Sequence, residues 1–210
     1  MAATEHPMHA LADFLPEGSF DQVLHYIHRY KVHLTVTRAR KTVLGDYRHA
    51  THGKNHRISI NGNLNKYEFL ITLLHELAHL LTFEQFSNRV DPHGKEWKHI
   101  YGTLLADFVR LKLFPPDIEA ALRTSIMNPA ATANGEIDLL LVLRRYNPNQ
   151  KNGFQPLESL PTGTIFQTEN GRIFQKGEKR RKRYMCLEIK TGHLYTFSPI
   201  SEVKALESGK

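Results

Sequence analysis

The segment over residues 71–83, ITLLHELAHLLTF, places three ionisable side chains inside an apolar helical pattern. This pattern extends over residues 65–85, and its leucines cover most of the helix circumference, which is typical of a helix at the centre of a protein. His75, Glu76 and His79 are costly to bury there unless partners satisfy them. The chain therefore has to fold around this helix and has to supply something that pairs with these three side chains.

His75 and His79 are four residues apart, so on a helix their imidazoles project from the same face. This HExxH spacing allows two histidine nitrogens to bind one zinc ion, with Glu76 close enough to reach a zinc-bound water. Zinc lowers the pKa of that water, and the carboxylate can take its proton and deliver it to a leaving amine. Peptide hydrolysis is therefore the expected reaction. A structural role for the histidines is the alternative, and the apolar surroundings disfavour it because unliganded imidazoles would be poorly solvated.

A catalytic zinc usually has three protein ligands and one open position, so a third ligand must come from elsewhere. The metzincin continuation needs a glycine and a histidine where this chain has Thr82 and Gln85, which excludes that class. We expect His93 to be the third ligand, because it opens a helix that can fold back on the first. Glu96 and His99 remain the alternatives.

The patterns on either side of the central helix predict an α+β domain. The expected helices are residues 19–30, 95–113 and 116–126, and three short antiparallel strands are expected within residues 31–40, 41–50 and 56–64. The last of these helices begins at Pro115 or Pro116, because proline is favoured in the first helical turn.

The stretch NPAATANG, residues 128–135, is small, polar and bears proline and glycine, which favours a domain boundary. We expect a first domain over residues 1–128, a linker over residues 129–136 and a small all-β module over residues 137–210. The strands of the module are expected within residues 137–146, 163–177 and 183–197, with turns at Asn170-Gly171 and Thr191-Gly192.

Composition limits the partners and the compartment. Cys186 is the only cysteine, which excludes an internal disulfide and a cysteine-based zinc ribbon. No apolar run is long enough to span a membrane, and the first residues do not resemble a signal peptide, so we expect a soluble cytoplasmic protein. The formal charge of +7 favours acidic partners such as nucleic acid.

The densest charge run is KGEKRRKR, residues 176–183, between two expected strands and flanked by Phe174 and Tyr184. It is a candidate nucleic-acid contact, in which an aromatic ring could stack on a base. A solvated turn is the alternative. The basic residues of this candidate contact are Lys176, Lys179, Arg180, Arg181, Lys182 and Arg183.

The motif HELAH, followed after 13 residues by HGKEWK, resembles the SprT-like zinc metallopeptidase family, which spans bacterial SprT and Spartan-type protease domains. The upstream segments RARKTVLGDYR and HRISINGNLN are similar to the strands of that family, so the resemblance covers roughly residues 19–114. It implies a compact, zincin-like α+β domain with an open cleft. It also implies one Zn²⁺ ion held by His75, His79 and His93, with Glu76 as the general base.

The resemblance further implies proteolysis of DNA-bound or crosslinked proteins, as in the best-known members. SprT-like proteins often carry a C-terminal zinc ribbon with paired cysteines, whereas this tail holds only Cys186, so we expect a ribbon-like β module without a metal. Tyr101 has two open roles, polarising a substrate carbonyl or packing in the core.

We therefore expect a zinc-dependent metalloendopeptidase with a protein substrate. DNA is a candidate partner, and the nucleoid a candidate location within the cytoplasm. Two alternatives remain, a nucleic-acid-binding protein with a structural zinc site and a zinc hydrolase that acts on a small amide. The sequence does not indicate an oligomeric state.

Overall fold

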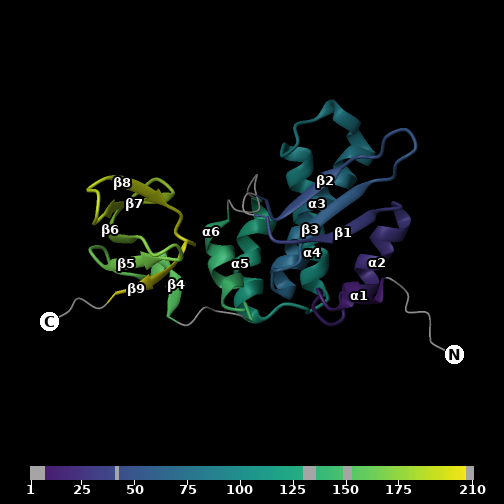
Figure 1. Ribbon diagram of the computed structural model, residues 1–210. Coiled ribbons are helices and arrows are strands. Elements are labelled where there is room, and N and C mark those ends of the chain that lie inside the picture. The colour runs from purple at the N-terminus through teal and green to yellow at the C-terminus, as the bar shows by residue number, and fades with distance from the viewer. Residues whose placement is uncertain (1–7, 41–42, 130–135, 149–152, 207–210) are drawn as a thin grey trace. The chain divides into compact units, whose positions relative to one another are not determined.

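The computed structural model describes residues 8–40, 43–129, 136–148 and 153–206. The chain divides into two compact units, an α+β unit over residues 1–147 and an all-β unit over residues 148–210 (Figure 1). The helices of the first unit are α1 (His9–Ala12), α2 (Phe20–Arg29), α3 (Lys66–Phe86), η1 (Ser87–Arg89), α4 (Lys95–Arg110), α5 (Pro116–Met127) and α6 (Ile137–Arg144). Its strands are β1 (His33–Thr37), β2 (Gly45–Arg48) and β3 (Arg57–Asn61).

Helix α3 is the central element of the first unit, because its sequence is apolar on nearly every side. It contacts β2, β3, α4 and α6, and five of its six leucines are fully buried, whereas Leu81 is half-buried. The helix begins after Asn65, whose side-chain oxygen accepts hydrogen bonds from the amides of Tyr67 (3.1 Å) and Glu68 (3.0 Å). This N-cap satisfies donors that the first turn leaves free. The helix predicted over residues 65–85 is confirmed.

The sheet lies against α3 and has the strand order β1-β3-β2 (Figure 1). Strand β2 pairs with β3 in the antiparallel sense, but β1 pairs with β3 in the parallel sense. The prediction of a purely antiparallel sheet is therefore wrong. Consecutive strands do alternate in direction, but β3 inserts between β1 and β2, so two strands that run in the same direction become neighbours. Strand β2 is left at one edge of the sheet.

Helix α4 packs against α3 and against α5. The contact between α4 and α5 is close at Gly102, where an added Cβ would lie 2.6 Å from the carbonyl oxygen of Ile126. Helix α4 ends before the two prolines, and Pro116 is the first residue of α5, as the sequence predicts. Helix α2 follows Ser19 as predicted, but the Ser19 hydroxyl donates to the Pro16 carbonyl instead of capping the helix.

Helix α6 replaces the strand that the sequence predicts over residues 137–146. Its buried leucines, Leu139, Leu140 and Leu143, pack it against α3 and α5. The prediction was wrong because a short apolar run fits a buried strand and a buried helix equally well. The first unit continues to Asn147, beyond the boundary expected at residues 129–136. Most of that expected linker, residues 130–135, lies outside the described residues.

The second unit is one six-stranded sheet with the order β4-β9-β5-β6-β7-β8. Its elements are β4 (Phe154–Pro156), η3 (Leu157–Ser159), β5 (Ile165–Thr168), β6 (Ile173–Arg180), β7 (Arg183–Glu188), β8 (Leu194–Phe197) and β9 (Glu202–Ala205). The predicted turns are present, and Gly171 and Gly192 adopt positive φ angles of 82° and 69°. Strands β4 and β9 were not predicted, because each is too short to show an alternating pattern.

Candidate metal centre

Three histidines from two segments converge in the first unit. His75 and His79 project from α3, and His93 comes from the loop that leads into α4. One nitrogen of each lies within 4.8 Å of the other two, and the ring centroids are 4.6 to 5.5 Å apart. Nitrogens that share a tetrahedral zinc at ~2.0 Å are roughly 3.3 Å apart, so small side-chain rotations would complete such a site. Among the described residues, neither Glu96 nor His99 belongs to this cluster.

The protonation states of these histidines fit a metal cation. Burial, together with the neighbouring imidazoles of His79 and His93, lowers the pKa of His75 to about 3. Burial, with His93 nearby, lowers the pKa of His79 to about 4, and burial also lowers the pKa of His93. All three are therefore neutral at pH 7, which is the form that binds metals.

The hydrogen-bonding state of His93 supports the same interpretation. Its Nε2 atom is buried and has no hydrogen-bond partner among the described residues. A buried polar atom without a partner costs free energy, and such atoms in native structures call for an explanation. A cation between the three rings would satisfy this nitrogen, so the donor set fits a divalent metal such as zinc.

Trp97 supports all three rings from α4. It is fully buried, and its ring centroid lies 4.7 Å from that of His75, 5.3 Å from that of His79 and 4.7 Å from that of His93. Tyr101 packs one turn further along α4, 4.9 Å from Trp97 and 5.4 Å from His75. Sequence reasoning missed Trp97, although its i+4 spacing from His93 places both near the start of one helix.

Tyr101 does not line the open cleft beside the histidines. It is only 3% exposed and borders a small enclosed cavity near Glu136 and Leu140. Burial raises the pKa of its hydroxyl well above the usual value, and the carboxylates of Glu136 and Glu76 act in the same direction. Of the two roles left open by the sequence, packing fits this position.

Glu76 lies next to His75 on α3 and is only 6% exposed. Burial and, to a smaller extent, Asp46 raise the pKa of its carboxyl to about 8, although Arg40 acts in the opposite direction. The carboxyl lies against Gly45 of β2, where an added Cβ would be 2.6 Å from Glu76 Oε1. The edge strand therefore approaches this side chain as closely as it does only because residue 45 is a glycine. Apart from the presence of a glycine at position 45, this contact could not be predicted from the sequence.

An open cleft of about 580 Å³ lies over the cluster. Its walls are β2 with the preceding residues on one side and the segment of residues 87–93 on the other. His75, Glu76 and His79 line it from α3. The backbone of β2 pairs with β3 alone among the described strands, so its outer edge is open to another extended chain.

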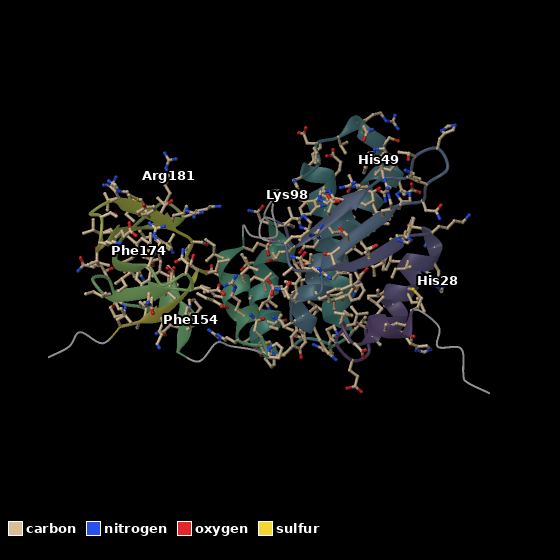
Figure 2. All side chains as sticks on the ribbon, viewed as in Figure 1. His28, His49, Lys98, Phe154, Phe174 and Arg181 are labelled. Atoms are coloured by element: carbon tan, nitrogen blue, oxygen red, sulfur yellow. The ribbon has the colours of Figure 1, made fainter. Side chains whose placement is uncertain are left out.

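A hydrogen-bonded chain holds β2 in place beside the cleft. The amide of Ala50 donates to Nδ1 of His56 (3.3 Å), so the ring proton lies on Nε2, which pairs with Glu84 (3.2 Å). The Tyr47 hydroxyl then donates to the same Nδ1 (2.9 Å), and the Tyr47 ring stacks on His79 at 6.4 Å. His49, labelled in Figure 2, stacks on a phenylalanine of α3 at 4.6 Å.

The six basic residues predicted to contact nucleic acid divide into two groups. Lys176 is buried, donates to the Leu157 carbonyl (2.8 Å) and lies 3.9 Å from the Tyr184 ring centroid. Lys179 pairs with Glu158 (3.0 Å). These two lysines therefore stabilise the second unit. The other four are exposed near the turn between β6 and β7: Arg180, Arg181, Lys182 and Arg183.

The aromatic rings that flank this run are not available to a base. Phe174 is 1% exposed and Tyr184 is 8% exposed, and both belong to the core of the second unit. Figure 2 shows Phe174 among the strands and Arg181 extending outward. The predicted stacking surface is therefore absent at these two positions.

Comparison with known proteins gives one match. Residues 13–111 match the model of the SprT-like family, from before α2 to the end of α4. The matched segment contains all three histidines, Glu76 and β2. No curated protein and no solved structure matches the chain. Among the described residues, no helix combines the length and the hydropathy needed to cross a membrane.

Proposed function

We propose, from the premise that residues 13–111 form a domain of the SprT-like family, that this protein is a zinc metalloendopeptidase with a zincin-like catalytic unit. One observation carries the proposal. Three neutral imidazoles converge beside a buried carboxylate, and all four side chains lie at or next to an open cleft. His75, His79 and His93 would hold one Zn²⁺ ion, and the cleft leaves room for a further ligand.

When bound, the zinc ion supplies a Lewis acid that polarises the scissile carbonyl and lowers the pKa of water. Glu76 acts as the general base, taking a proton from water and delivering it to the leaving amine. A cation near Glu76 favours the ionised carboxylate, which opposes the rise in pKa caused by burial. Gly45 leaves space for this carboxyl, and Trp97 holds the imidazoles in place.

The open edge of β2 favours a polypeptide substrate. An extended peptide can add to an exposed sheet edge through main-chain hydrogen bonds, and Gly45–Arg48 presents such an edge along the cleft. This position would bring a peptide bond past Glu76. A small amide would use neither the length of the cleft nor the strand edge, so the amidohydrolase alternative is less well supported.

Metal content and activity test the proposal together. We expect about one zinc per chain in the wild type and a loss of most of it in His75→Ala and His93→Ala. His99→Ala is the matched control, because His99 is exposed on α4, six residues after His93, and lies outside the cluster. Equal zinc in all four proteins would contradict the assignment.

Glu76→Gln separates a catalytic zinc from a structural one. We expect this variant to keep its zinc and to cleave an unfolded protein substrate about 10³-fold more slowly, as for other general bases. Structural zinc sites are usually closed by four protein ligands, and the described residues supply three here. Unchanged activity in Glu76→Gln would favour the nucleic-acid-binding alternative.

DNA association has less support than zinc binding. The formal charge of +7 and the exposed arginines favour it, but the buried rings of Phe174 and Tyr184 do not. Binding that depends on phosphates weakens steeply with salt. Affinity for DNA that stays unchanged when the salt concentration rises severalfold would remove DNA as a partner.

A further inference from the structure

Four aliphatic side chains form an exposed patch on the second unit. Their exposed fractions are 38% for Ile173, 36% for Leu187, 51% for Ile189 and 64% for Leu194. Leu187 lies opposite Leu194 across β7 and β8, and the Ile189 amide donates to the Ile173 carbonyl (3.0 Å). Leu187 also pairs with Gln175, two residues from Ile173, so all four side chains share the outer face of the sheet. We call these four residues the aliphatic face.

Leu187 and Leu194 of the aliphatic face also line a groove of about 300 Å³, whose other lining residues include Gly177, Glu178, Arg180 and Met185. The pairing of β6 with β7 shifts at this point, and an added Cβ at Gly177 would lie 2.4 Å from the Met185 carbonyl oxygen. The groove therefore depends on a β-bulge that only glycine permits. Exposed aliphatic residues are unremarkable when single, but a contiguous group with a groove indicates a binding surface.

The rim of this face is basic. Residues 148–210 contain 11 Lys and Arg against six Glu, a formal charge of +5 out of +7 for the chain. Arg180, Arg181, Lys182 and Lys190 are exposed and have no ion-pair partner in the part of the chain that the structure describes. Arg181 occupies the turn with a positive φ of 55° and extends outward (Figure 2). Glu178 is the acidic residue of the groove lining, and the exposed basic residues outnumber it, so the net charge favours an acidic partner.

The chemistry of the face selects a peptide over nucleic acid. Single-stranded nucleic acid binds through bases stacked on exposed aromatic rings. Here the aromatic rings face inward, since Phe174 and Tyr184 are buried and Tyr195 and Phe197 pack against the same core. The outward side chains are aliphatic, and these fit leucine, isoleucine or valine side chains of a partner.

We infer that the aliphatic face, with its basic rim, is a docking site for an acidic peptide segment that carries aliphatic residues. The apolar side chains of the segment contact Leu187 and Leu194, and its carboxylates lie near Arg180 and Lys182. The site shares no residue with the histidine cluster and requires no metal and no peptide-bond cleavage. It would give the protein a means of selecting partners that the cleft itself does not provide.

Fluorescence anisotropy with the full chain tests this site. The probe is a labelled peptide of about 12 residues that repeats Glu-Glu-Leu, and Glu76→Gln is included in every protein so that the probe is not cleaved. Two matched peptides repeat Glu-Glu-Ser and Lys-Lys-Leu. We expect the Glu-Glu-Leu peptide to bind at least about tenfold more tightly than either, because only it matches both the aliphatic face and the rim.

Two sets of substitutions locate the binding. Leu187→Ser with Leu194→Ser should weaken binding of the Glu-Glu-Leu peptide about tenfold, whereas Leu111→Ser should leave it unchanged. Leu111 is the matched control, because it is 45% exposed and belongs to the first unit. Arg180→Ala with Lys182→Ala should weaken binding and reduce its salt dependence.

The single cysteine reports whether the second unit stays folded. Cys186 is fully buried in β7, so a thiol reagent should modify it slowly in every folded variant. Rapid modification of Cys186 in the leucine variant would mean that its second unit is unfolded. The inference is then tested with the Arg180 and Lys182 variant, whose substitutions are at exposed sites.

Three results would overturn the inference. Binding of the Glu-Glu-Ser peptide as tight as that of the Glu-Glu-Leu peptide would show that charge alone determines the affinity. Displacement of the probe by oligodeoxythymidine, with the same loss in the leucine variant, would assign the face to nucleic acid. A wild-type dimer that the leucine variant converts to a monomer would assign it to a second copy of the chain.

Discussion

Both units bury ionisable side chains, but they differ in whether those side chains have hydrogen-bond partners. In the second unit, Lys176 donates to the Leu157 carbonyl and Glu188 accepts from Arg172 at 2.7 Å. In the first unit, His93 Nε2 has no partner among the described residues. Each buried charge of the second unit is thus paired within it, whereas the histidine cluster is incomplete without an added cation.

This difference separates structural polar groups from functional ones. A buried group that forms hydrogen bonds within its own unit stabilises the fold. Its removal lowers the unfolding free energy, because its former partners stay buried without a hydrogen bond. A buried group that lacks a partner costs free energy in the metal-free protein, and where two further ligand nitrogens lie beside it, as at His93, it indicates a metal ion. Substitutions in the two units should therefore change different measured quantities.

Lys176→Ala should give the largest effect, a loss of about 3 kcal/mol in the unfolding free energy of the second unit. The substitution removes the Lys176 donor from the carbonyl of Leu160, removes one of two donors from the carbonyl of Leu157, which keeps the Leu160 amide (3.2 Å), and removes the contact with Tyr184. Denaturant titration followed by the reactivity of the buried Cys186 thiol measures it. Lys182→Ala, at an exposed position, is the control and should change stability by less than about 0.5 kcal/mol. An equal effect of the two variants would show that Lys176 is not a structural lysine.

Gly45→Ala should lower protease activity about 100-fold, or about 2.7 kcal/mol, with zinc content unchanged. The added Cβ would lie 2.6 Å from Glu76 Oε1, so either the carboxyl or β2 has to move. Because this loss acts through Glu76, Gly45→Ala should add little to the loss in Glu76→Gln, and the two effects should not be additive. Full additivity in the double variant would show that Gly45 acts independently of the carboxyl.

Trp97→Leu should weaken zinc binding by about 10- to 100-fold, because the ring that contacts all three imidazoles is lost. Trp97→Phe keeps an aromatic support and should change the affinity by less than about threefold. Competition with a chromophoric chelator measures both. Trp97 is the only tryptophan, so its fluorescence in the wild type should also respond directly to metal binding. Equal affinity in the leucine variant would contradict a supporting role.

Much of the first unit could be predicted from the sequence, because its central helix has a strong pattern. The apolar residues around His75 and Glu76 define α3, and the four-residue spacing places His79 on the same face. His93 could be proposed because it opens the next helix. The strand order could not be predicted, since alternation shows strand directions but does not show which strands pair.

Other features depend on contacts between distant segments, which no local pattern shows. The approach of Gly45 to Glu76 and the packing of Trp97 on the histidines are of this kind. The burial of Lys176, however, could have been predicted from the sequence. In a strand, side chains two residues apart share a face, so a lysine two residues after the core residue Phe174 has to point inward. The prediction missed this alternation because Lys176 was grouped with the other basic residues of the run over residues 176–183.

In the metal-free protein, the two units should lose stability at different pH values as acid is added. The pKa values of His75 and His79 lie near 3 and 4 in the folded state, below the value of 6.5 expected when unfolded. Between these values the unfolded chain binds more protons, so the first unit loses stability as the pH falls below 6.5. The expected loss is about 1 kcal/mol for each of these histidines between pH 7.5 and pH 5.5.

The second unit should lose stability only at lower pH. The hydrogen bonds from Arg172 and Thr191 lower the pKa of Glu188 to about 2, from a usual value of 4.5. Its contribution is therefore present above pH 4.5 and is lost as the pH falls toward 2. Hydrogen exchange of the metal-free chain at pH 7.5 and pH 5.5 should show weaker protection of α3 and α4 and unchanged protection of β6 and β7. Unchanged protection of α3 and α4 would show that the histidines of the cluster take up protons equally in the folded and unfolded states.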